Sequence, residues 1–452
     1  MPDVGIASDA SALMFPPLYT ADEMRAAEAG HDVEQLMERA GRAVADAVIA
    51  HYPEALKVCA VCGKGANGGD GRIALRFLQH EGRETSEELE SEADVVIDAL
   101  FGTGFRGEPR EEAAALIERI NAHGAPVVAV DIPSGVDAST GEAPGAAVRA
   151  DVTVTMHGPK VGVVVAPGRF LAGEVVVADI GLEDAETRHR IVTDEILATV
   201  PRRREQDTKY TAGSVLVVGG SPGITGAVCL AAEAAFRADA GYVAVATAKD
   251  SMPVVEVRLL EAVKRPLDEV DEAAERATAF AIGPGLGRGG DQKKLVARLL
   301  GELAIPAVVD ADALFGLEPG DWPAPRVLTP HAGELGRLLG EESDWVDAHR
   351  LEAVRRAVDR FGCVVLLKGA DTLVAGPDEG VLVCTAGTPA LATAGTGDVL
   401  TGTIAAFLAK GMEARLAAAA AAVACGRAAR LAPQSVGLVA SDVIAALPLA
   451  LA

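Results

Sequence analysis

Short apolar runs alternate with helical stretches along most of the chain, and several of these runs end in a glycine-rich loop. Lys57–Cys62, Asp94–Leu100 and Pro126–Val130 are three such runs. This alternation is typical of a parallel sheet covered by helices on both faces. Half of the 452 residues are hydrophobic and only 4% are aromatic, so Val, Leu, Ile and Ala must fill the cores. The sequence therefore predicts an α/β protein, and its length favours more than one domain.

The alternation is interrupted once, by the charged stretch Leu182–Asp207, which contains three consecutive arginines and reads as a connector. We predict two domains, residues 1–190 with a Rossmann-like three-layer sandwich and residues 191–452 with a larger α/β fold. Residues 1–18 lack periodicity and read as a loose tail, and Thr20–Glu23 has the spacing of a helix capping box. The strands predicted after the connector are Ser214–Val218, Tyr242–Thr247, Ala279–Ile282, Ala307–Val309, Arg326–Leu328 and Val364–Leu367.

Acidic residues outnumber basic residues by 65 to 41, which gives a formal net charge of −24. A protein of this charge repels phosphate backbones, so we expect no nucleic-acid partner. The acidic excess suits a high-salt cytoplasm, and the alternative is an ordinary acidic cytosolic enzyme. The N-terminus lacks the pattern of a secretory signal, and the alanine-rich run Leu416–Gly426 is too short to span a membrane. We therefore expect a cytoplasmic protein with no membrane partner.

Cys59 and Cys62 form a C-x-x-C pair, a spacing found in zinc and redox sites. They lie within a predicted strand, where positions three apart point to opposite faces. We therefore predict that both thiols pack in the core.

The loop Gly63–Gly71 follows a strand, opens a helix and contains G-x-G-x-x-G. Alone, this pattern is a weak signal for a dinucleotide-binding dehydrogenase, which also needs an acidic residue at the end of a second strand about 20 residues further on. The acid-rich stretch Glu84–Glu92 stands there, and we predict no strand in it. The sequence therefore does not favour a dehydrogenase.

Three loops in the first half carry polar side chains just after predicted strands. Asn67 lies in the first loop, Asp98 ends the second strand, and Ser134 follows the third. Because ligands of open parallel sheets bind beyond the carboxyl ends of the strands, we expect these loops to form one site. Their oxygen atoms could hold a hard cation, and the alternative is that each is ordinary turn chemistry.

The second half ends several predicted strands in similar loops, and Gly395-Thr396-Gly397-Asp398 then opens a helix. Amides at the start of a helix can stabilise a phosphoryl group, and an aspartate in the first turn can act as a base. The chain has no Walker G-x-x-x-x-G-K-[ST] sequence, so a different design for phosphoryl transfer is indicated.

The first half resembles the NAD(P)H-hydrate epimerase domain through N-G-G-D-G, V-I-D-A-L-F-G-T-G and D-I-P-S-G-V-D. The resemblance implies a K⁺ ion held by Asn67, Asp98 and Ser134, and Asp131 as acid or base at C6 of the hydrated nicotinamide. Ala66 replaces the first of two asparagines usual in the family, and the segment between residues 79 and 93 is shortened. The implied substrate contacts are Ala66, Asn67, Gly68, Gly69, Asp70, Gly102, Thr103, Gly104, Phe105, Arg106, Gly107, Glu108 and Asp131.

The second half resembles the ribokinase-like ADP-dependent NAD(P)H-hydrate dehydratases through G-P-G-L-G, T-P-H-A-G-E, K-G-A-D-T and G-T-G-D. Tyr210 stands where that family often has glycine. The resemblance implies Asp398 as the catalytic base, ADP or ATP as phosphoryl donor, and accompanying Mg²⁺. The implied substrate contacts are Ala227, Gly287, His331 and Asp398, and the implied nucleotide contacts are Lys368, Gly369, Ala370, Asp371, Thr372 and Gly397.

Together the resemblances predict repair of hydrated NADH and NADPH (NADHX and NADPHX), by epimerisation of the C6 hydrates and nucleotide-dependent dehydration of the S epimer. We also expect a homo-oligomer. One alternative is a ribokinase-like small-molecule kinase with a non-catalytic N-terminal binding domain. Another is a scaffold, because the first domain type also occurs without catalysis in an mRNA-decapping protein.

Overall fold

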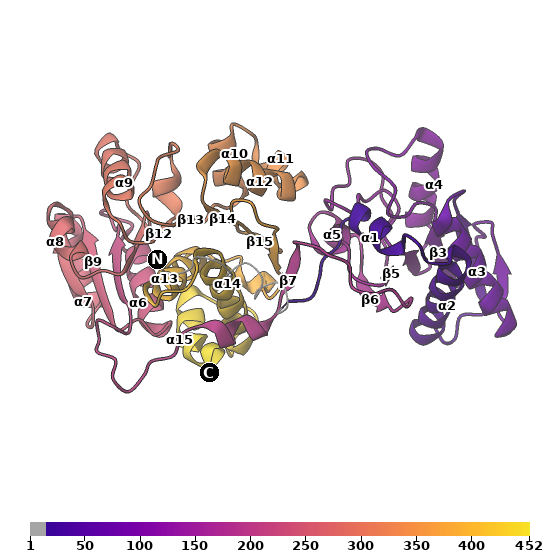
Figure 1. The fold of residues 1–452 in the computed structure, drawn as a ribbon, viewed down its shortest axis with the longest axis horizontal. Coiled ribbons are helices and arrows are strands. Elements are labelled where there is room, and N and C mark those ends of the chain that lie inside the picture. Colours follow the sequence, from indigo (N-terminus) through magenta and orange to yellow (C-terminus); the bar gives the residue numbers. More distant parts are fainter. Residues whose placement is uncertain (1–14) are drawn as a thin grey trace. The chain divides into compact units, whose positions relative to one another are not determined.

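The computed structural model describes residues 15–452, which form two compact units (Figure 1). The first unit comprises Pro17–Arg190 and Asp347–Leu351. The second comprises Ile191–Val346 and Glu352–Ala452, together with the described residues Phe15 and Pro16. The two units are described separately below.

The first unit is built on a six-stranded sheet with strand order β2-β1-β3-β4-β5-β6. Every neighbouring pair in this sheet is parallel. All carboxyl ends of the strands therefore lie along one edge, where loops can meet. The strands are β1 (Lys57–Cys62), β2 (Glu84–Ser86), β3 (Val95–Ala99), β4 (Val127–Val130), β5 (Val152–Met156) and β6 (Glu174–Ala178).

Helices cover both faces of this sheet because successive strand residues point to opposite sides. Val58 and Ala60 of β1 belong to the core that includes α2 and α3, whereas Cys59 and Val61 pack with Ile117 of α4 on the other face. The predicted three-layer sandwich is confirmed. The helices are α1 (Ala21–Glu28), α2 (Val33–His51), α3 (Ala66–His80), α4 (Glu111–Asn121), α5 (Val161–Val164) and the 3₁₀ turn η1 (Gly168–Phe170).

The prediction that the stretch Glu84–Glu92 contains no strand was wrong. Glu84–Ser86 forms the short edge strand β2, which pairs in parallel with β1. Its main chain makes the pairing, since the Glu84 amide donates to the Leu56 carbonyl oxygen at 2.8 Å. A three-residue strand with polar side chains leaves no apolar pattern, so nothing in the sequence indicated this strand.

The second unit contains a ten-stranded sheet with order β10-β9-β8-β11-β12-β13-β14-β15-β16-β7. Pairing is parallel from β10 to β14 and antiparallel where β15 meets β14 and β16. Six of the strands follow the predicted ranges. The strands are β7 (Arg190–Val192), β8 (Ser214–Val218), β9 (Tyr242–Thr247), β10 (Val263–Pro266), β11 (Ala279–Ile282), β12 (Ala307–Val309), β13 (Arg326–Leu328), β14 (Val364–Leu367), β15 (Thr372–Ala375) and β16 (Leu382–Cys384).

Four helices, α6 and α13 to α15, form the main core of the second unit against one face of this sheet (Figure 1). The remaining helices and turns connect the strands. The α-helices are α6 (Thr225–Arg237), α7 (Met252–Arg258), α8 (Val270–Ala274), α9 (Gly290–Glu302), α10 (Ala332–Leu339), α11 (Ser343–Ala348), α12 (Arg350–Phe361), α13 (Thr396–Ala409), α14 (Ala414–Leu431) and α15 (Ala440–Leu451). The 3₁₀ turns are η2 (Asp194–Thr199), η3 (Lys249–Ser251), η4 (Leu267–Glu269), η5 (Ala311–Leu314) and η6 (Pro389–Leu391).

Two predictions about irregular segments need correction. The connector carries β7 and η2, and Ile196 of η2 is buried in the core of the second unit. Phe15 and Leu18, which fall in the predicted tail, are also buried. The rest of that tail and the absence of a secretory signal concern residues 1–14, which lie outside the described residues.

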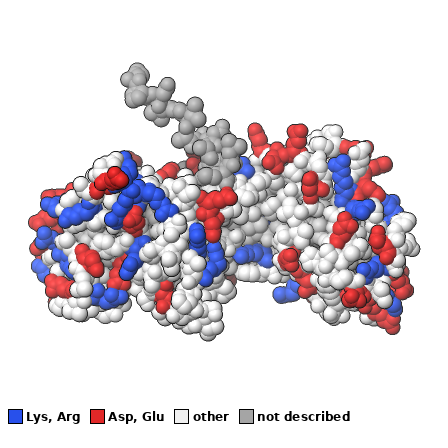
Figure 2. All heavy atoms as spheres, turned by 90° about the horizontal axis from the view of Figure 1, so that it is seen from below, with Lys and Arg blue, Asp and Glu red and all other residues white. Residues whose placement is uncertain are grey.

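The capping box at Thr20 is confirmed, because Thr20 and Glu23 exchange hydrogen bonds at the start of α1. Cys59 is buried, Cys62 is partly buried, and both are free thiols, as expected for packing in the core. Between residues 15 and 452, no helix is long and apolar enough to cross a membrane. On the face drawn in Figure 2, acidic and basic side chains are intermingled.

Close packing of α13 on α6 makes a first prediction. A methyl group at Gly402 of α13 would overlap the Ala231 carbonyl oxygen of α6, so Gly402→Ala should destabilise the second unit by roughly 1–3 kcal/mol through overpacking. Gly301 of α9 is the matched control, because an added methyl there meets open space. Gly301→Ala should stabilise by up to about 1 kcal/mol. Calorimetric unfolding of both variants would measure this, and equal effects would contradict the packing argument.

Candidate active sites

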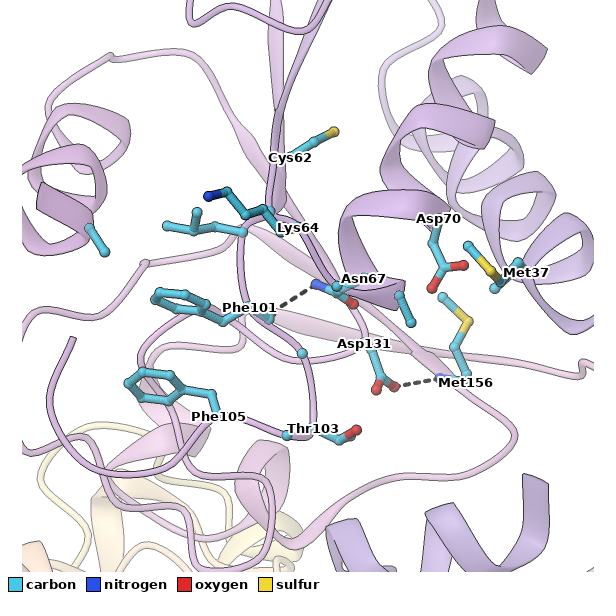
Figure 3. A pocket seen from close by; sticks show the side chains of 18 of the residues that line it. Met37, Cys62, Lys64, Asn67, Asp70, Phe101, Thr103, Phe105, Asp131 and Met156 are labelled. Atoms are coloured by element: carbon cyan, nitrogen blue, oxygen red, sulfur yellow. Dashed lines mark hydrogen bonds between the residues drawn. The ribbon is translucent and has the colours of Figure 1, made fainter. Parts of the chain in front are cut away.

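The first unit contains a cavity of about 1020 Å³ at the carboxyl edge of its sheet (Figure 3). Loops after β1, β3 and β4 line it, together with side chains of α1 and α2. The three loops come from neighbouring parallel strands, so their convergence follows from the topology. The predicted residues Asn67, Asp70 and Asp131 all line this cavity.

The three predicted cation ligands lie together around the main chain of Phe101. The Ser134 hydroxyl donates to Asp98 Oδ1 at 2.6 Å, and the Ser134 amide donates to Asp98 Oδ2 at 2.8 Å. The Phe101 amide donates to Ser134 Oγ at 2.8 Å, while Asn67 Nδ2 donates to the Phe101 carbonyl oxygen at 2.8 Å. A methyl group added at Gly102 would press on the Asn67 side chain. The three segments that carry Asn67, Asp98 and Ser134 therefore bring oxygen atoms to one point in the fold.

Asp98 is fully buried at this point. Burial raises the pKa of its carboxyl to about 6, against the lowering effect of the hydrogen bonds from Ser134 and Leu100. A nearby positive charge would stabilise the ionised form of this carboxyl group, because burial penalises a charge that has no partner. The surrounding groups offer further oxygen atoms, which are the donors that alkali cations prefer.

Asp131 follows β4 in the left-handed backbone region, with φ of 66°, which is uncommon for a residue other than glycine and costs energy. Its Oδ1 accepts a hydrogen bond from the Met156 amide at 3.1 Å and forms an ion pair with Lys160. Lys160 is almost wholly buried and also donates to the Met156 carbonyl oxygen at 2.6 Å and to Thr155 Oγ1 at 3.1 Å.

Sequence reasoning did not identify Lys160. Its signal was a lysine placed just after the strand Val152–Met156, in the same kind of position as the other site residues. That signal is weak, because most lysines that follow strands are exposed to solvent. The structure shows instead that Lys160 holds Asp131 in place.

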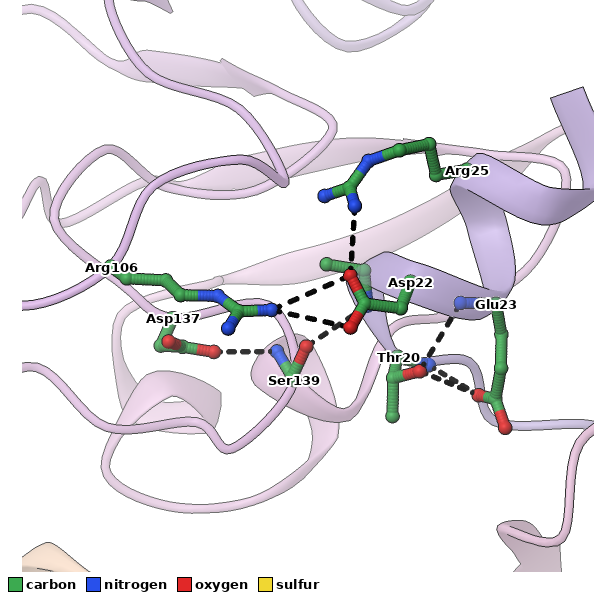
Figure 4. Close-up of polar contacts among 8 residues, drawn as sticks. Thr20, Asp22, Glu23, Arg25, Arg106, Asp137 and Ser139 are labelled. Carbon is green, nitrogen blue, oxygen red and sulfur yellow. Dashed lines mark hydrogen bonds and ion pairs between the residues drawn. The ribbon is translucent and has the colours of Figure 1, made fainter. Parts of the chain in front are cut away.

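The loop Gly102–Glu108 forms one wall of the cavity. The rings of Phe101 and Phe105 stack with their centroids 4.8 Å apart, and the loop is tied to α1 by Arg106, which lies 3.5 Å from the Asp22 carboxylate (Figure 4). Three of the predicted contact residues do not line the cavity. These are Gly68, Gly69 and Gly107.

The second unit gathers charged side chains at the carboxyl ends of its central strands. Lys368, after β14, places Nζ 2.9 Å from Asp310 Oδ1 and 3.8 Å from Glu334 Oε2. Asp310, which is buried, also accepts a hydrogen bond from Thr401 of α13 at 2.7 Å. Burial would lower the pKa of Lys368, but the carboxylates of Asp310 and Glu334 outweigh this effect and raise it.

Asp398 lies in the first turn of α13, beside this charged group. The preceding Gly395 adopts the left-handed conformation with φ of 90°, and a methyl group there would meet Leu230 and Ala440. Gly397 lies against Lys368 Nζ, so the start of α13 and the lysine face each other. Burial raises the pKa of Asp398 to about 7, and the charge of Asp310 contributes in the same direction.

The other predicted contacts of the second unit take different structural roles. The Gly287 amide donates to Asp312 Oδ2 at 2.9 Å, and Ala227 lies in the first turn of α6. His331 caps α10, since its Nδ1 accepts from the Gly333 amide at 3.1 Å, and its ring is more than half exposed. Gly369, Ala370 and Asp371 form the connection between antiparallel β14 and β15, and Thr372 begins β15.

Asp310 and Glu334 are further residues that sequence reasoning did not single out. Asp310 directly follows the predicted strand Ala307–Val309, and Glu334 is the last residue of T-P-H-A-G-E. Their importance appears only in three dimensions, because Asp310, Glu334 and Lys368 come from three separate loops. Acidic residues after strands are also common in turns, so the sequence offered no way to choose them.

Comparison with known proteins identifies both halves of the chain. A family model described as NAD(P)H-hydrate dehydratase matches residues 215–448. A second, described as YjeF-related protein N-terminus, matches residues 33–85 and 80–162. Among solved structures, an ADP/ATP-dependent NAD(P)H-hydrate dehydratase from Bacillus subtilis, co-crystallized with ATP/Mg²⁺, has 30% sequence identity and a TM-score of 0.54. It covers 57% of this chain and 96% of its own.

Two curated relatives match across both units. A bifunctional NAD(P)H-hydrate repair enzyme of Moorella thermoacetica is 37% identical over an alignment that covers 85% of this chain and 85% of the relative. The enzyme of the same description from Salinibacter ruber is also 37% identical, with coverages of 92% and 91%. The chain therefore belongs to the family of bifunctional NAD(P)H-hydrate repair enzymes.

Proposed function

We propose that this chain repairs hydrated NADH and NADPH with two activities. The first unit interconverts the two C6 epimers of the hydrate, and the second unit dehydrates the S epimer with ADP or ATP as phosphoryl donor. The observation that carries the proposal is the position of Asp398, at the start of α13 and beside the Lys368–Asp310 pair. This arrangement places a base, a helix N-terminus and a cation at one point, as phosphoryl transfer requires.

Dehydration is difficult because hydroxide is a poor leaving group. In the proposed reaction Asp398 accepts the proton of the C6 hydroxyl, whose oxygen then takes the terminal phosphoryl group of the nucleotide. The amides of Gly395–Gly397 and the ammonium of Lys368 stabilise the charge that develops on the transferred group. Loss of phosphate, with a proton from the adjacent carbon, restores the dihydropyridine ring.

The predicted contacts divide between the two substrates of the second unit. Ala227, Gly287, His331 and Asp398 would contact the hydrate, and Lys368–Thr372 with Gly397 would contact the nucleotide. Mg²⁺ is expected with the nucleotide, in line with the Bacillus subtilis structure obtained with ATP/Mg²⁺. Asp310 and Glu334 are oxygen donors beside Lys368 that are suited to such a complex. A stable phosphorylated product would instead indicate the kinase alternative.

For the first unit we propose K⁺ at Asn67, Asp98 and Ser134, and Asp131 as an acid or base at C6. The donor set fits a monovalent cation, because it combines one buried carboxylate with neutral oxygen atoms of Phe101 and Ser134. The shortened segment between residues 79 and 93 holds the edge strand β2. We propose that the shortening leaves this site intact, because β2 lies beyond β1 at the outer edge of the sheet.

The proposed function predicts a simple division of activities. With both C6 epimers and ADP or ATP supplied, the chain should recover the absorbance of all the reduced nicotinamide. With the S epimer alone it should do so without needing epimerisation. Chromatographic separation of the epimers measures the two reactions independently. Failure to consume the S epimer with either nucleotide would contradict the dehydratase assignment.

We expect the protein to be a homo-oligomer. Sedimentation of the same sample measures its oligomeric state.

A third prediction concerns the cation. K⁺ should raise the unfolding temperature of the first unit more than Na⁺ does at equal ionic strength, because a ligand that binds only the folded state stabilises it. Asp98→Asn should remove the difference between the two salts and slow epimerisation. Asp46→Asn is the control, since that carboxylate is exposed on α2. The same K⁺ preference in Asp98→Asn would exclude this site.

A fourth prediction concerns Asp398, which must be ionised to act as base. Because its folded pKa is raised to about 7, dehydration should slow as the pH falls through about 7. Asp398→Asn should lower the rate by about 10²–10⁴-fold.

The raised pKa of Asp398 also means that its ionisation opposes folding, so the free energy of unfolding falls as the pH rises from about 4 toward 7. Asp398→Asn should therefore melt at the same or a higher temperature at pH 8. Wild-type turnover in this variant would refute the assignment.

A further inference from the structure

A second carboxyl group, that of Asp70, faces the cavity of the first unit. Asp70 lies on α3, one turn after Asn67, and is only 9% exposed. Figure 3 shows its carboxyl group on a different wall from Asp131, beside Met37 and Met156. Among the described residues, its Oδ1 atom has no hydrogen-bond partner. An unpaired buried polar atom is costly, and here it is directed into a cavity that would hold a substrate.

The two carboxyl groups have opposite surroundings. Asp131 is paired with the ammonium of Lys160 and accepts a hydrogen bond from the Met156 amide. Asp70 forms no ion pair with any described residue, and burial raises its pKa to about 8, with the negative charges of Asp131 and Glu28 acting in the same direction. Asp131 is therefore held in an ion pair, whereas the surroundings of Asp70 favour its neutral carboxylic acid. Two acids placed in contrasting environments in one cavity are a common basis for acid–base catalysis.

We propose that Asp70 is a second catalytic residue of epimerisation, which acts as proton donor while Asp131 acts as proton acceptor across the C6 carbon of the hydrate. This inference rests on the proposed function of the first unit. Its basis in the structure is that the two carboxyl groups come from different walls of one cavity, α3 and the loop after β4.

The proposed step balances with one water molecule as co-reactant. Asp70 donates its proton to the C6 hydroxyl, the C6–O bond breaks, and water leaves with the bonding electrons while the N1 lone pair forms an N1=C6 double bond. On the opposite face Asp131 accepts a proton from a second water, whose oxygen bonds to C6 as the π electrons return to N1. The products are the inverted hydrate, one water, ionised Asp70 and protonated Asp131. The reverse reaction starts from ionised Asp70 and protonated Asp131. Proton exchange with solvent restores protonated Asp70 and ionised Asp131.

The charged groups around Asp70 support this division of roles. Glu28 of α1 and Asp131 both repel an ionised Asp70, and the ammonium of Lys160 is already held by Asp131, Thr155 and Met156. If Asp70 only bound the substrate, its protonation state would change the affinity for the hydrate but not the rate of turnover. The two roles therefore differ in whether removing the proton changes the turnover rate or only the affinity.

The test uses the full chain and follows interconversion of the C6 epimers of hydrated NADH without nucleotide. Asp70→Asn keeps the shape and neutral charge of the acid but cannot donate a comparable proton, so kcat should fall by about 10²–10⁴-fold in both directions, with KM changed by less than about threefold. The decline of the wild-type rate as pH rises through about 8, where Asp70 ionises, should also disappear. Glu81→Gln, an exposed acid-to-amide change at the end of the same helix, is the matched control and should leave kcat unchanged.

Two measurements guard against loss of the fold. The unfolding temperature of Asp70→Asn should equal or exceed that of the wild type at pH 7, and Asp70→Ser should show the same loss of kcat if the amide is not tolerated. In water labelled with ¹⁸O, each wild-type inversion should place one labelled oxygen on C6. Retained ¹⁶O at C6, or a kcat of Asp70→Asn and Asp70→Ser within tenfold of the wild type, would overturn the proposal. If the wild-type chain does not interconvert the epimers above the spontaneous rate, the proposed epimerase function fails, and this inference fails with it.

Discussion

The parallel pairing of neighbouring strands is the constraint on which both sites depend. It brings the loops after β1, β3 and β4 to one edge in the first unit, and those after β12, β13 and β14 to one edge in the second. Each loop supplies one or two polar groups, and none of them forms a site alone. The strands that carry these loops are mostly apolar and almost wholly buried, so they can fix the positions of the loops without taking part in the chemistry.

Within this frame, the buried charges are distributed unequally. Lys160 and Lys368 each pair with a buried aspartate. Among the described residues Asp70 and Asp398 form no ion pair, and burial and nearby negative charge raise the pKa of both, although Lys368 partly opposes this effect at Asp398. A buried carboxyl without a partner weakens the fold. Both units bear this cost at the edge where ligands would bind, which is where such costs are usually found in enzymes.

Much of the fold could be predicted because buried parallel strands leave a strong apolar signal. The ranges of β8, β9 and β11 to β14 follow directly from it. The short strands β2 and β7 could not be predicted, because main-chain hydrogen bonds at a sheet edge need no particular side chain. For the sites, glycine-rich loops located Asn67, Asp98, Asp131 and Asp398. Lys160 and Asp310 could not be identified as site residues, because their roles arise from contacts between segments that are distant in the sequence.

Strand β7 has a consequence for how the second unit can be handled as a separate protein. It pairs with β16 and forms the last strand of the ten-stranded sheet, although it lies in the charged segment that joins the two halves of the sequence. A fragment beginning at Ser214 would lack it, and the amides and carbonyls of β16 would lie open to another molecule. Such exposed edges promote aggregation. A soluble fragment therefore has to begin before Arg190, well upstream of the first strand that carries a catalytic loop.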